Sequence, residues 1–233
     1  MEHHSNFVPW QMLRDAHGIE LRVAPITEAG ELDMAALERL LGDGRVGLVA
    51  ITHMSNVLGT YTPAERIARL AHAHGARVLF DGSQAVVHRR IDVHAIGADF
   101  YAFTGHKLYG PTGIGVLWGR RELLEAMPPF LGGGDMISSV SIERSTWAGV
   151  PHKFEAGTPA ILEAIGLGAA VGFVEDIGYE AIAAHEASLT DHALARLAAI
   201  EGVQVIGRAQ DRRGHQLHAR PRPSARHRDP ARP

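Results

Sequence analysis

The chain has 233 residues, of which 45% are apolar, and its formal net charge at pH 7 is −3. A chain of this size can bury the core of one large domain, while no run of it approaches the roughly 18 consecutive apolar residues that a membrane span needs. Cysteine is absent, which excludes disulfides, thiolate metal ligands and a cysteine nucleophile within these residues.

The first residues and the charge argue against export and against nucleic-acid binding. The opening MEHHSNFVPW has no basic stretch followed by an apolar one, so no signal peptide is expected and the predicted location is the cytoplasm. Residues 211–233 carry seven arginines against two aspartates, which leaves the rest of the chain acidic. We therefore expect neither nucleic acid nor a membrane as a partner.

Residues 1–210 show apolar periodicities that predict alternating helices and strands. Gly18 and Gly75 stand where a helix end favours glycine, Asp33 is a predicted helix cap, and Pro63 is a predicted first-turn residue. In chain order, we expect helices over 8–17, 34–42, 63–75 and 121–127, and strands over 19–25, 46–52, 76–81, 99–105 and 113–119.

The apolar run Val46–Thr52 is typical of a parallel strand that is covered on both faces. Strands that alternate with helices at this spacing predict an α/β fold with a doubly wound, mostly parallel central sheet flanked by helices. In such sheets, ligands bind outside the carboxyl ends of the strands. Asp81 and Lys107 each stand where a predicted strand ends, so both are expected at this edge.

The character of the sequence changes after Thr158. We interpret 1–158 as a large domain, and we expect two long helices and a strand in 159–210, which begin a smaller C-terminal α/β domain. Residues 211–233 are rich in Arg, Pro and His and are predicted to be disordered, because they have too few large apolar side chains to form a core. Two interpretations of this tail stay open. It is either a basic binding tail or, as we favour, the product of a shifted reading frame. With GC-rich codons, the same nucleotides can encode, one frame away, a sequence that alternates like a strand and then begins a helix.

A lysine among glycines marks the most informative stretch, DFYAFTGHKLYGPTGIGVLWG. A lysine that acts as a nucleophile is desolvated, and glycines let the backbone approach a ligand closely. Pyridoxal phosphate needs such a lysine for a Schiff base, a carboxylate on its pyridine nitrogen, and donors for its ring oxygen and its phosphate. Lys107 is the candidate for the Schiff base, and Asp81 for the pyridine nitrogen. Gln84 can donate to the ring oxygen, and Thr104 and His106 can donate to the phosphate. The stretch EHHSN offers a histidine that can stack on the ring.

Taken singly, none of these residues indicates a catalytic or cofactor-binding role. A lysine after a strand is usually solvated, an aspartate at a strand end is usually a turn residue, and 15 histidines make chance proximity common. The ordered set, in which one strand leads to Asp81 and the next to Lys107, is much harder to obtain by chance. No metal site is predicted, because His72 and His74 lie two apart on a helix and therefore face different sides.

The sequence resembles the class V aminotransferase family of PLP-dependent fold type I enzymes, in its branch of SUF-type cysteine desulfurases and selenocysteine lyases. The blocks that carry this resemblance stand in family order over about residues 1–210: EHHSNFVPWQ, THMSNVLGT, VLFDGSQAVVH, DFYAFTGHKLYGPTGIGVLWG, GGGDMI and FEAGTP. The resemblance implies the large domain of that fold, truncated at its N-terminus, so that the chain is expected to be a central fragment.

The resemblance also implies residue roles. Lys107 would form the Schiff base and, with His4 stacked on the ring, make up the catalytic centre, while Asp81 would hold the pyridine nitrogen. The further cofactor contacts that it implies are Gln84 on the ring oxygen, Thr104 and His106 on the phosphate, Asn56 beside the cofactor and the substrate carboxylate, and Thr158 on the phosphate of the neighbouring subunit of a homodimer.

The implied activity is that of a cysteine desulfurase, which takes sulfur from L-cysteine, leaves L-alanine and passes the sulfur to an acceptor protein for iron–sulfur cluster assembly. The family's persulfide-carrying cysteine and its carboxylate-binding arginine have no counterpart in this chain, so we expect the fragment to be inactive alone. Selenocysteine lyase and class V aminotransferase are alternatives within the same chemistry. A non-catalytic truncated product is the alternative of another class.

Overall fold

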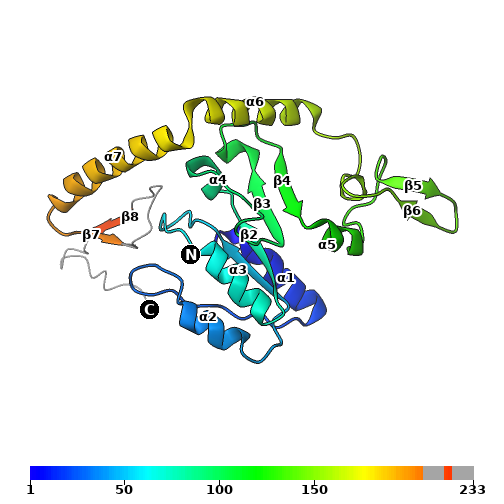
Figure 1. Cartoon of the computed structure of the whole chain (residues 1–233), viewed down its shortest axis with the longest axis horizontal. Helices are drawn as coiled ribbons and strands as arrows, with labels where there is room; N and C mark the ends of the chain where they lie inside the picture. Colours follow the sequence, from blue (N-terminus) through cyan, green and yellow to red (C-terminus); the bar gives the residue numbers. More distant parts are fainter. Residues whose placement is uncertain (207–217, 222–233) are drawn as a thin grey trace, which may run out of the picture.

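A four-stranded sheet forms the centre of the computed structural model, which describes residues 1–206 and 218–221 (Figure 1). Its strands, in spatial order, are β1 (Leu48–Thr52), β2 (Arg77–Asp81), β3 (Phe100–Thr104) and β4 (Gly115–Gly119). The first three strands run parallel, and β4 runs antiparallel to β3. The prediction of a mostly parallel α/β sheet is confirmed.

Helices form where the apolar periodicity predicts them. The predicted helices are α1 (Val8–His17), α2 (Met34–Leu41), α3 (Ala64–Ala73) and α5 (Arg121–Ala126). The single turn α4 (Ala85–His88) and the 3-10 turns η1 (His4–Asn6) and η2 (Gly105–Lys107) are additional elements that the sequence analysis does not predict. Gly18 ends α1 with a φ of 68°, a left-handed conformation that glycine adopts at little cost. The Asp33 carboxylate caps α2 by accepting the Ala36 N–H at 2.9 Å. Pro63 lies just before α3 rather than in its first turn.

The main core lies between the sheet and the helices α2 and α3, which lie side by side in Figure 1. Ile67 of α3 and Val78 and Phe80 of β2 are 0% exposed. Burying a side chain of this size contributes about 1.5–3 kcal/mol to stability. This packing holds β2 in place, and β2 ends at Asp81.

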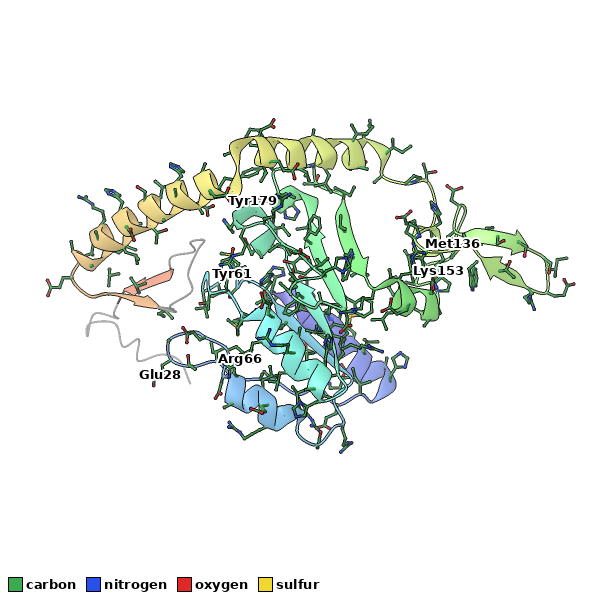
Figure 2. All side chains as sticks on the ribbon, in the orientation of Figure 1. Glu28, Tyr61, Arg66, Met136, Lys153 and Tyr179 are labelled. Atoms are coloured by element: carbon green, nitrogen blue, oxygen red, sulfur yellow. The ribbon has the colours of Figure 1, made fainter. Side chains whose placement is uncertain are left out.

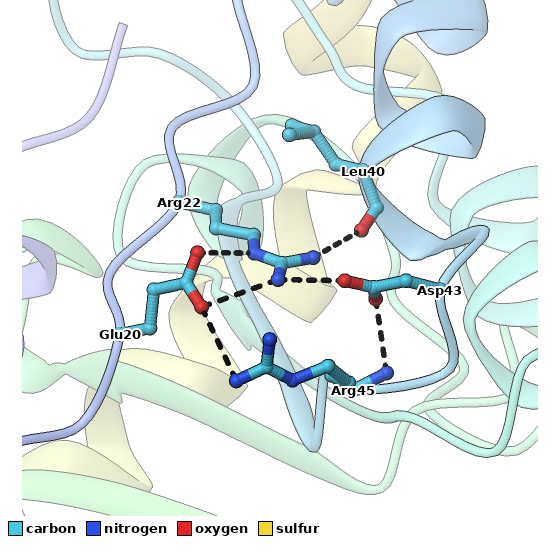
Figure 3. Close-up of polar contacts among 5 residues, drawn as sticks. All are labelled: Glu20, Arg22, Leu40, Asp43 and Arg45. Carbon is cyan, nitrogen blue, oxygen red and sulfur yellow. Dashed lines mark hydrogen bonds and ion pairs between the residues drawn. The ribbon is translucent and has the colours of Figure 1, made fainter.

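The prediction of a strand over 19–25 is wrong. The segment pairs with no strand in the described part of the chain, and a strand needs a neighbouring backbone to complete its hydrogen bonds. Side chains hold it instead: the Arg22 guanidinium donates to Glu20 at 2.8 Å and to the Leu40 carbonyl at 3.0 Å (Figure 3). The same guanidinium lies 2.7 Å from Asp43, and this hydrogen bond is the main cause that lowers the pKa of Asp43 to about 2.

A hairpin and two long helices follow the sheet. The hairpin strands β5 (Ile137–Val140) and β6 (Ser145–Trp147) pair antiparallel, and η3 (His152–Phe154), α6 (Ile161–Ile177) and α7 (Tyr179–Ala198) come next. The two helices confirm the prediction, whereas the hairpin was not predicted.

Buried side chains anchor this hairpin. Met136 and Lys153 lie at its base, where both are buried (Figure 2). The Lys153 ammonium donates to the carbonyls of Glu125 and Met127, at 2.9 and 2.7 Å, and so ties the segment after the hairpin to the end of α5. A buried ammonium is tolerated here because both of these acceptors satisfy its protons.

The last described elements are β7 (Val203–Ile206), which was predicted, and β8 (His218–Pro221), which pairs antiparallel with it. Strand β8 lies within 211–233, the tail that is expected to be disordered, and this expectation stays a prediction. The rest of that tail lies outside the described residues. Among the described helices, none is both long and apolar enough to cross a membrane. The division at residue 158 into a large domain and the start of a smaller one stays a prediction.

Candidate active site

Three neighbouring strand ends bring the two central residues of the predicted site to one edge of the sheet. Asp81 is the last residue of β2, and in register it stands between Thr52 of β1 and Ala102 of β3. Lys107 ends η2, which follows β3 directly. Since the three strands are parallel, these residues share the carboxyl edge, where ligands bind in α/β sheets.

The Asp81 carboxylate is oriented by its own turn. Its Oδ1 accepts the backbone N–H of Ser83 at 2.9 Å, while no hydrogen bond from any described residue reaches its Oδ2. The half-buried Gln84 follows at the start of α4. One oxygen of the carboxylate is thus fixed by the backbone and the other is open to a ligand.

The residues after β3 form the second part of the site. Thr104 Oγ1 and His106 Nδ1 lie 2.8 Å apart, so the hydroxyl and the imidazole orient each other. Lys107 is half-buried, and the structure gives its ammonium no hydrogen bond or ion pair with a described residue. Lysine occurs only twice in the sequence. The other lysine, Lys153, is buried and committed to two carbonyls, so Lys107 carries the one side-chain amine that a carbonyl compound can reach.

The glycines around Lys107 are explained by close packing. A Cβ on Gly105 would lie 2.8 Å from Ile114 Cγ2, and one on Gly110 would lie 2.9 Å from the Gly105 carbonyl oxygen. Tyr109 adopts a φ of 58°, which is uncommon for any residue other than glycine. The loop is therefore folded tightly on itself and holds the backbone at Lys107 in one conformation.

Asn56 carries an unsatisfied group. Its Oδ1 is buried and has no hydrogen-bond partner among the described residues. Leaving a buried polar atom without a partner costs about 1–3 kcal/mol. Asn56 lies in the turn after β1, where the Ser55 hydroxyl accepts the N–H groups of Val57 and Leu58, so the turn itself is well ordered. An unsatisfied acceptor in an ordered turn fits a ligand that supplies the missing donor.

His4 and Thr158 are placed differently. His4 is exposed in η1 and stacks on the His3 ring at 5.8 Å. Its segment is tied to the end of β1, because Glu2 accepts the Thr52 N–H. Thr158 is exposed between η3 and α6, in a segment that leads away from the hairpin rather than from a strand end of the central sheet.

Sequence reasoning missed three residues around the end of β2, of which Glu2 is half-buried and His53 and Tyr101 are buried. Glu2 lies at the end of β1, and its pKa is raised by burial, although the Thr52 and Asn6 hydrogen bonds act in the opposite direction. His53 and Tyr101 form a buried hydrogen bond of 2.9 Å. Burial raises the pKa of Tyr101 far above its usual range, and the charge of Asp81 adds to the shift. Periodicity gives no sign of these contacts, since each joins residues about fifty positions apart.

Comparison with known proteins agrees with this geometry. The family model described as Aminotransferase class-V matches residues 1–221, so the chain belongs to the class V aminotransferase family.

Within this family, the chain is similar to proteins named cysteine desulfurases. A cysteine desulfurase of Dickeya dadantii (strain 3937) is 57% identical over 208 residues, which are 89% of this chain and 50% of that protein. A probable cysteine desulfurase 1 of Mycobacterium leprae (strain TN) is 52% identical over 91% of this chain and 34% of that protein. The chain thus spans about half the length, or less, of these curated relatives.

Solved structures show the same fold. The crystal structure of the cysteine desulfurase CsdA from Escherichia coli matches with a TM-score of 0.87 and 42% identity, over 91% of this chain and 52% of that one. The apo structure of a cysteine desulfurase from Thermococcus onnurineus NA1 matches with a TM-score of 0.83 and 34% identity, over 94% of this chain and 55% of that one. The fold is therefore that of part of a cysteine desulfurase.

Proposed function

We propose that the carboxyl edge of the sheet binds pyridoxal 5'-phosphate as part of a cysteine desulfurase. The observation that carries this proposal is that an oriented carboxylate, Asp81, and a lysine without a bound partner among the described residues, Lys107, both follow strands at one edge of a parallel sheet. The unpartnered oxygen of Asn56 supports it, because a polar ligand at this edge would satisfy that atom.

Each residue then has a defined task. Lys107 would hold the cofactor through its aldehyde and, once released, take the proton from the substrate α-carbon. Asp81, steadied by the Ser83 N–H, would keep the pyridine nitrogen protonated. When bound, the cofactor supplies an electron sink for negative charge at the substrate α-carbon. The remaining residues proposed to hold it or the substrate are His4, Asn56, Gln84, Thr104, His106 and Thr158.

The proposed reaction of the whole enzyme takes sulfur from L-cysteine and leaves L-alanine, and the sulfur goes to an acceptor protein that serves iron–sulfur cluster assembly. The relatives' names favour cysteine over selenocysteine and over transamination. A thiolate must receive the sulfur, and these 233 residues contain no cysteine. We therefore expect the chain alone to bind the cofactor but to release little alanine.

A homodimer in the cytoplasm is part of the proposal. Thr158 would serve the site of a second subunit, which agrees with its exposed position between η3 and α6 rather than at a strand end of the central sheet. The exposed apolar residues at the start of α6 offer a surface for such contact, with Leu162 79% and Ile165 67% exposed. Large apolar side chains that gather on one surface are typical of protein interfaces.

Because the sequence contains only two lysines, Schiff-base formation by Lys107 can be tested with Lys153 as the control. Pyridoxal phosphate added to the purified chain should give a yellow complex, and borohydride should then fix the cofactor to Lys107, as peptide mapping would show. Lys107→Ala should stay colourless, whereas Lys153→Arg, which keeps a buried cation at the hairpin, should colour like the unchanged chain. Colour that survives Lys107→Ala, or label on another residue, would contradict the proposal.

A further inference from the structure

His53 and Tyr101 form a buried polar pair that the proposed reaction does not use. The exposed fractions are 4% for His53 and 2% for Tyr101, and His53 Nδ1 lies 2.9 Å from the Tyr101 hydroxyl. Both rings contact Phe80, with centroids 5.8 and 6.5 Å away. A hydrogen bond in such apolar surroundings is strong, and either partner is costly to leave unpaired.

The pair lies behind Asp81. Side chains alternate between the two faces of a strand, so Phe80 and Tyr101, which are register partners, share the face opposite to Asp81 and Ala102. Gly82 comes next on the face of Tyr101. A Cβ at Gly82 would lie only 2.0 Å from Tyr101 Cε1 and 2.3 Å from the Tyr101 hydroxyl oxygen. The absence of a side chain at Gly82 is what lets Tyr101 occupy this space and reach His53.

The peptide group between Asp81 and Gly82 is held from both sides. Its carbonyl accepts the His53 N–H at 2.8 Å, and its N–H donates to the Ala102 carbonyl at 2.8 Å. His53 thus uses its backbone on this peptide and its ring on Tyr101, the neighbour of Ala102. Together, these two backbone hydrogen bonds and the hydrogen bond between His53 and Tyr101 form a closed set of contacts around Asp81.

We propose that the hydrogen bond between His53 and Tyr101 positions Asp81 for the cofactor, by locking the Asp81–Gly82 peptide between the ends of β1 and β3. Both would be positioning residues, because they are buried on the face of the sheet opposite to the Asp81 side chain and would act on the cofactor through Asp81. The inference rests on the proposed function in one respect, namely that the Asp81 carboxylate holds the pyridine nitrogen.

Tyr101→Phe tests this, since it removes the hydroxyl and keeps the ring. Partners that orient a functional group typically account for about tenfold or more in binding, so cofactor affinity should fall by about tenfold. The visible absorption band of the bound cofactor should also shift, because the ring nitrogen would be less firmly protonated. In the cofactor-free chain, hydrogen exchange of the Gly82 amide should become several-fold faster, a readout that does not depend on the cofactor.

Tyr179→Phe is the matched control. It removes a half-buried hydroxyl that donates to the Val86 carbonyl in α4 at 3.1 Å and to no group of the Asp81–Gly82 peptide, His53 or Tyr101. This variant should leave the band, the affinity and the Gly82 exchange unchanged. His53→Asn, whose amide reaches the position of Nδ1, should keep most of the affinity, whereas His53→Leu should lose as much as Tyr101→Phe.

The outcomes separate this inference from the proposed function. If the unchanged chain gives no colour that depends on Lys107, the proposed function is wrong and the inference falls with it. If the unchanged chain binds the cofactor and Tyr101→Phe gives the same affinity and the same band, the inference alone is wrong. An unchanged exchange rate at the Gly82 amide would also overturn it.

Discussion

The Glu2 carboxylate accepts the backbone N–H of Thr52 with both oxygens, at 3.0 and 2.9 Å, across fifty positions of the chain. Asn6 donates to the same carboxylate at 2.7 Å. The N–H of Thr52 points away from β2, because His53, the next residue, bonds to β2 on the other side. Glu2 therefore satisfies a donor on the open edge of β1 and fixes the segment that carries His4.

Glu2→Gln should change how stability depends on pH. Burial raises the pKa of Glu2 above its ordinary value of 4.5, so the folded chain holds this proton more tightly than the unfolded chain does. The contribution of Glu2 to stability is therefore complete below pH 4.5 and declines as the pH rises through the raised value. Urea unfolding at a series of pH values should show the unchanged chain losing stability relative to Glu2→Gln over this window, and parallel curves would contradict the prediction.

Asp99→Asn should destabilise the fold without altering the candidate site. Asp99 is 1% exposed. Its carboxylate accepts the Val78 N–H at 2.8 Å and lies 2.7 Å from His72 and 3.1 Å from Arg120. Removing one partner of a buried ion pair costs about 3–5 kcal/mol, and the lower end applies here because His72 and Arg120 are partly exposed.

Asp99 precedes β3, at the edge of the sheet opposite to Asp81. Folded Asp99→Asn should therefore bind pyridoxal phosphate like the unchanged chain. Chemical denaturation and cofactor titration together check this prediction. A large loss of affinity under conditions where the variant is fully folded would count against it.

Gly82→Ala should be strongly destabilising for its size. The added methyl would lie 2.0 Å from the Tyr101 ring, so Tyr101 must move and its bond to His53 must break. Overpacking of this kind costs about 1–3 kcal/mol. Gly47→Ala is the matched control, because a Cβ there meets no atom within 4 Å, and it should change the free energy of unfolding by less than about 1 kcal/mol. Equal effects of the two changes in urea unfolding would disprove the packing argument.

Arg22→Ala should raise the pKa of the Asp43 carboxyl toward its ordinary value. Because the Arg22 hydrogen bond is the main cause that lowers the pKa of Asp43 to about 2, the carboxyl resonance of Asp43 should titrate near that value in the unchanged chain. In Arg22→Ala the midpoint should return toward the ordinary value of 3.8. An NMR titration checks this directly. A midpoint that stays near 2 in the variant would assign the shift to the remaining contact with the Arg45 N–H.

Much of the fold could be predicted because its signals are local. Glycine after α1, aspartate before α2 and apolar runs at the strands each act within a few residues. The segment 19–25 shows the limit of this reasoning: its alternation suits a strand, yet only a neighbouring backbone makes one, and here Arg22 holds it by side-chain contacts. The hairpin of β5 and β6 was missed because its strands are short and mostly exposed, so no apolar pattern marks them.

The candidate site divides in the same way. That Asp81 and Lys107 lie at the carboxyl edge of the sheet was predictable, since each comes at or just after the end of an apolar strand. The contacts of Glu2, His53 and Tyr101 were not, because the face on which a side chain lies depends on strand register. A histidine directly after a strand run was visible in the sequence, but nothing local indicated that Tyr101 would meet it behind Gly82.

The peptide between Asp81 and Gly82 is bonded to two strands that come from distant parts of the chain, and this bears on the order of events in folding. Helices can form early, whereas contacts between distant segments must wait until the intervening loops have closed. A collapsed chain whose strands are not yet aligned would not hold Asp81 and Lys107 at one edge of a sheet, and should therefore not form the yellow complex with pyridoxal phosphate. If the chain refolds in the presence of pyridoxal phosphate, the time at which the yellow colour appears should therefore report when β1, β2 and β3 become aligned.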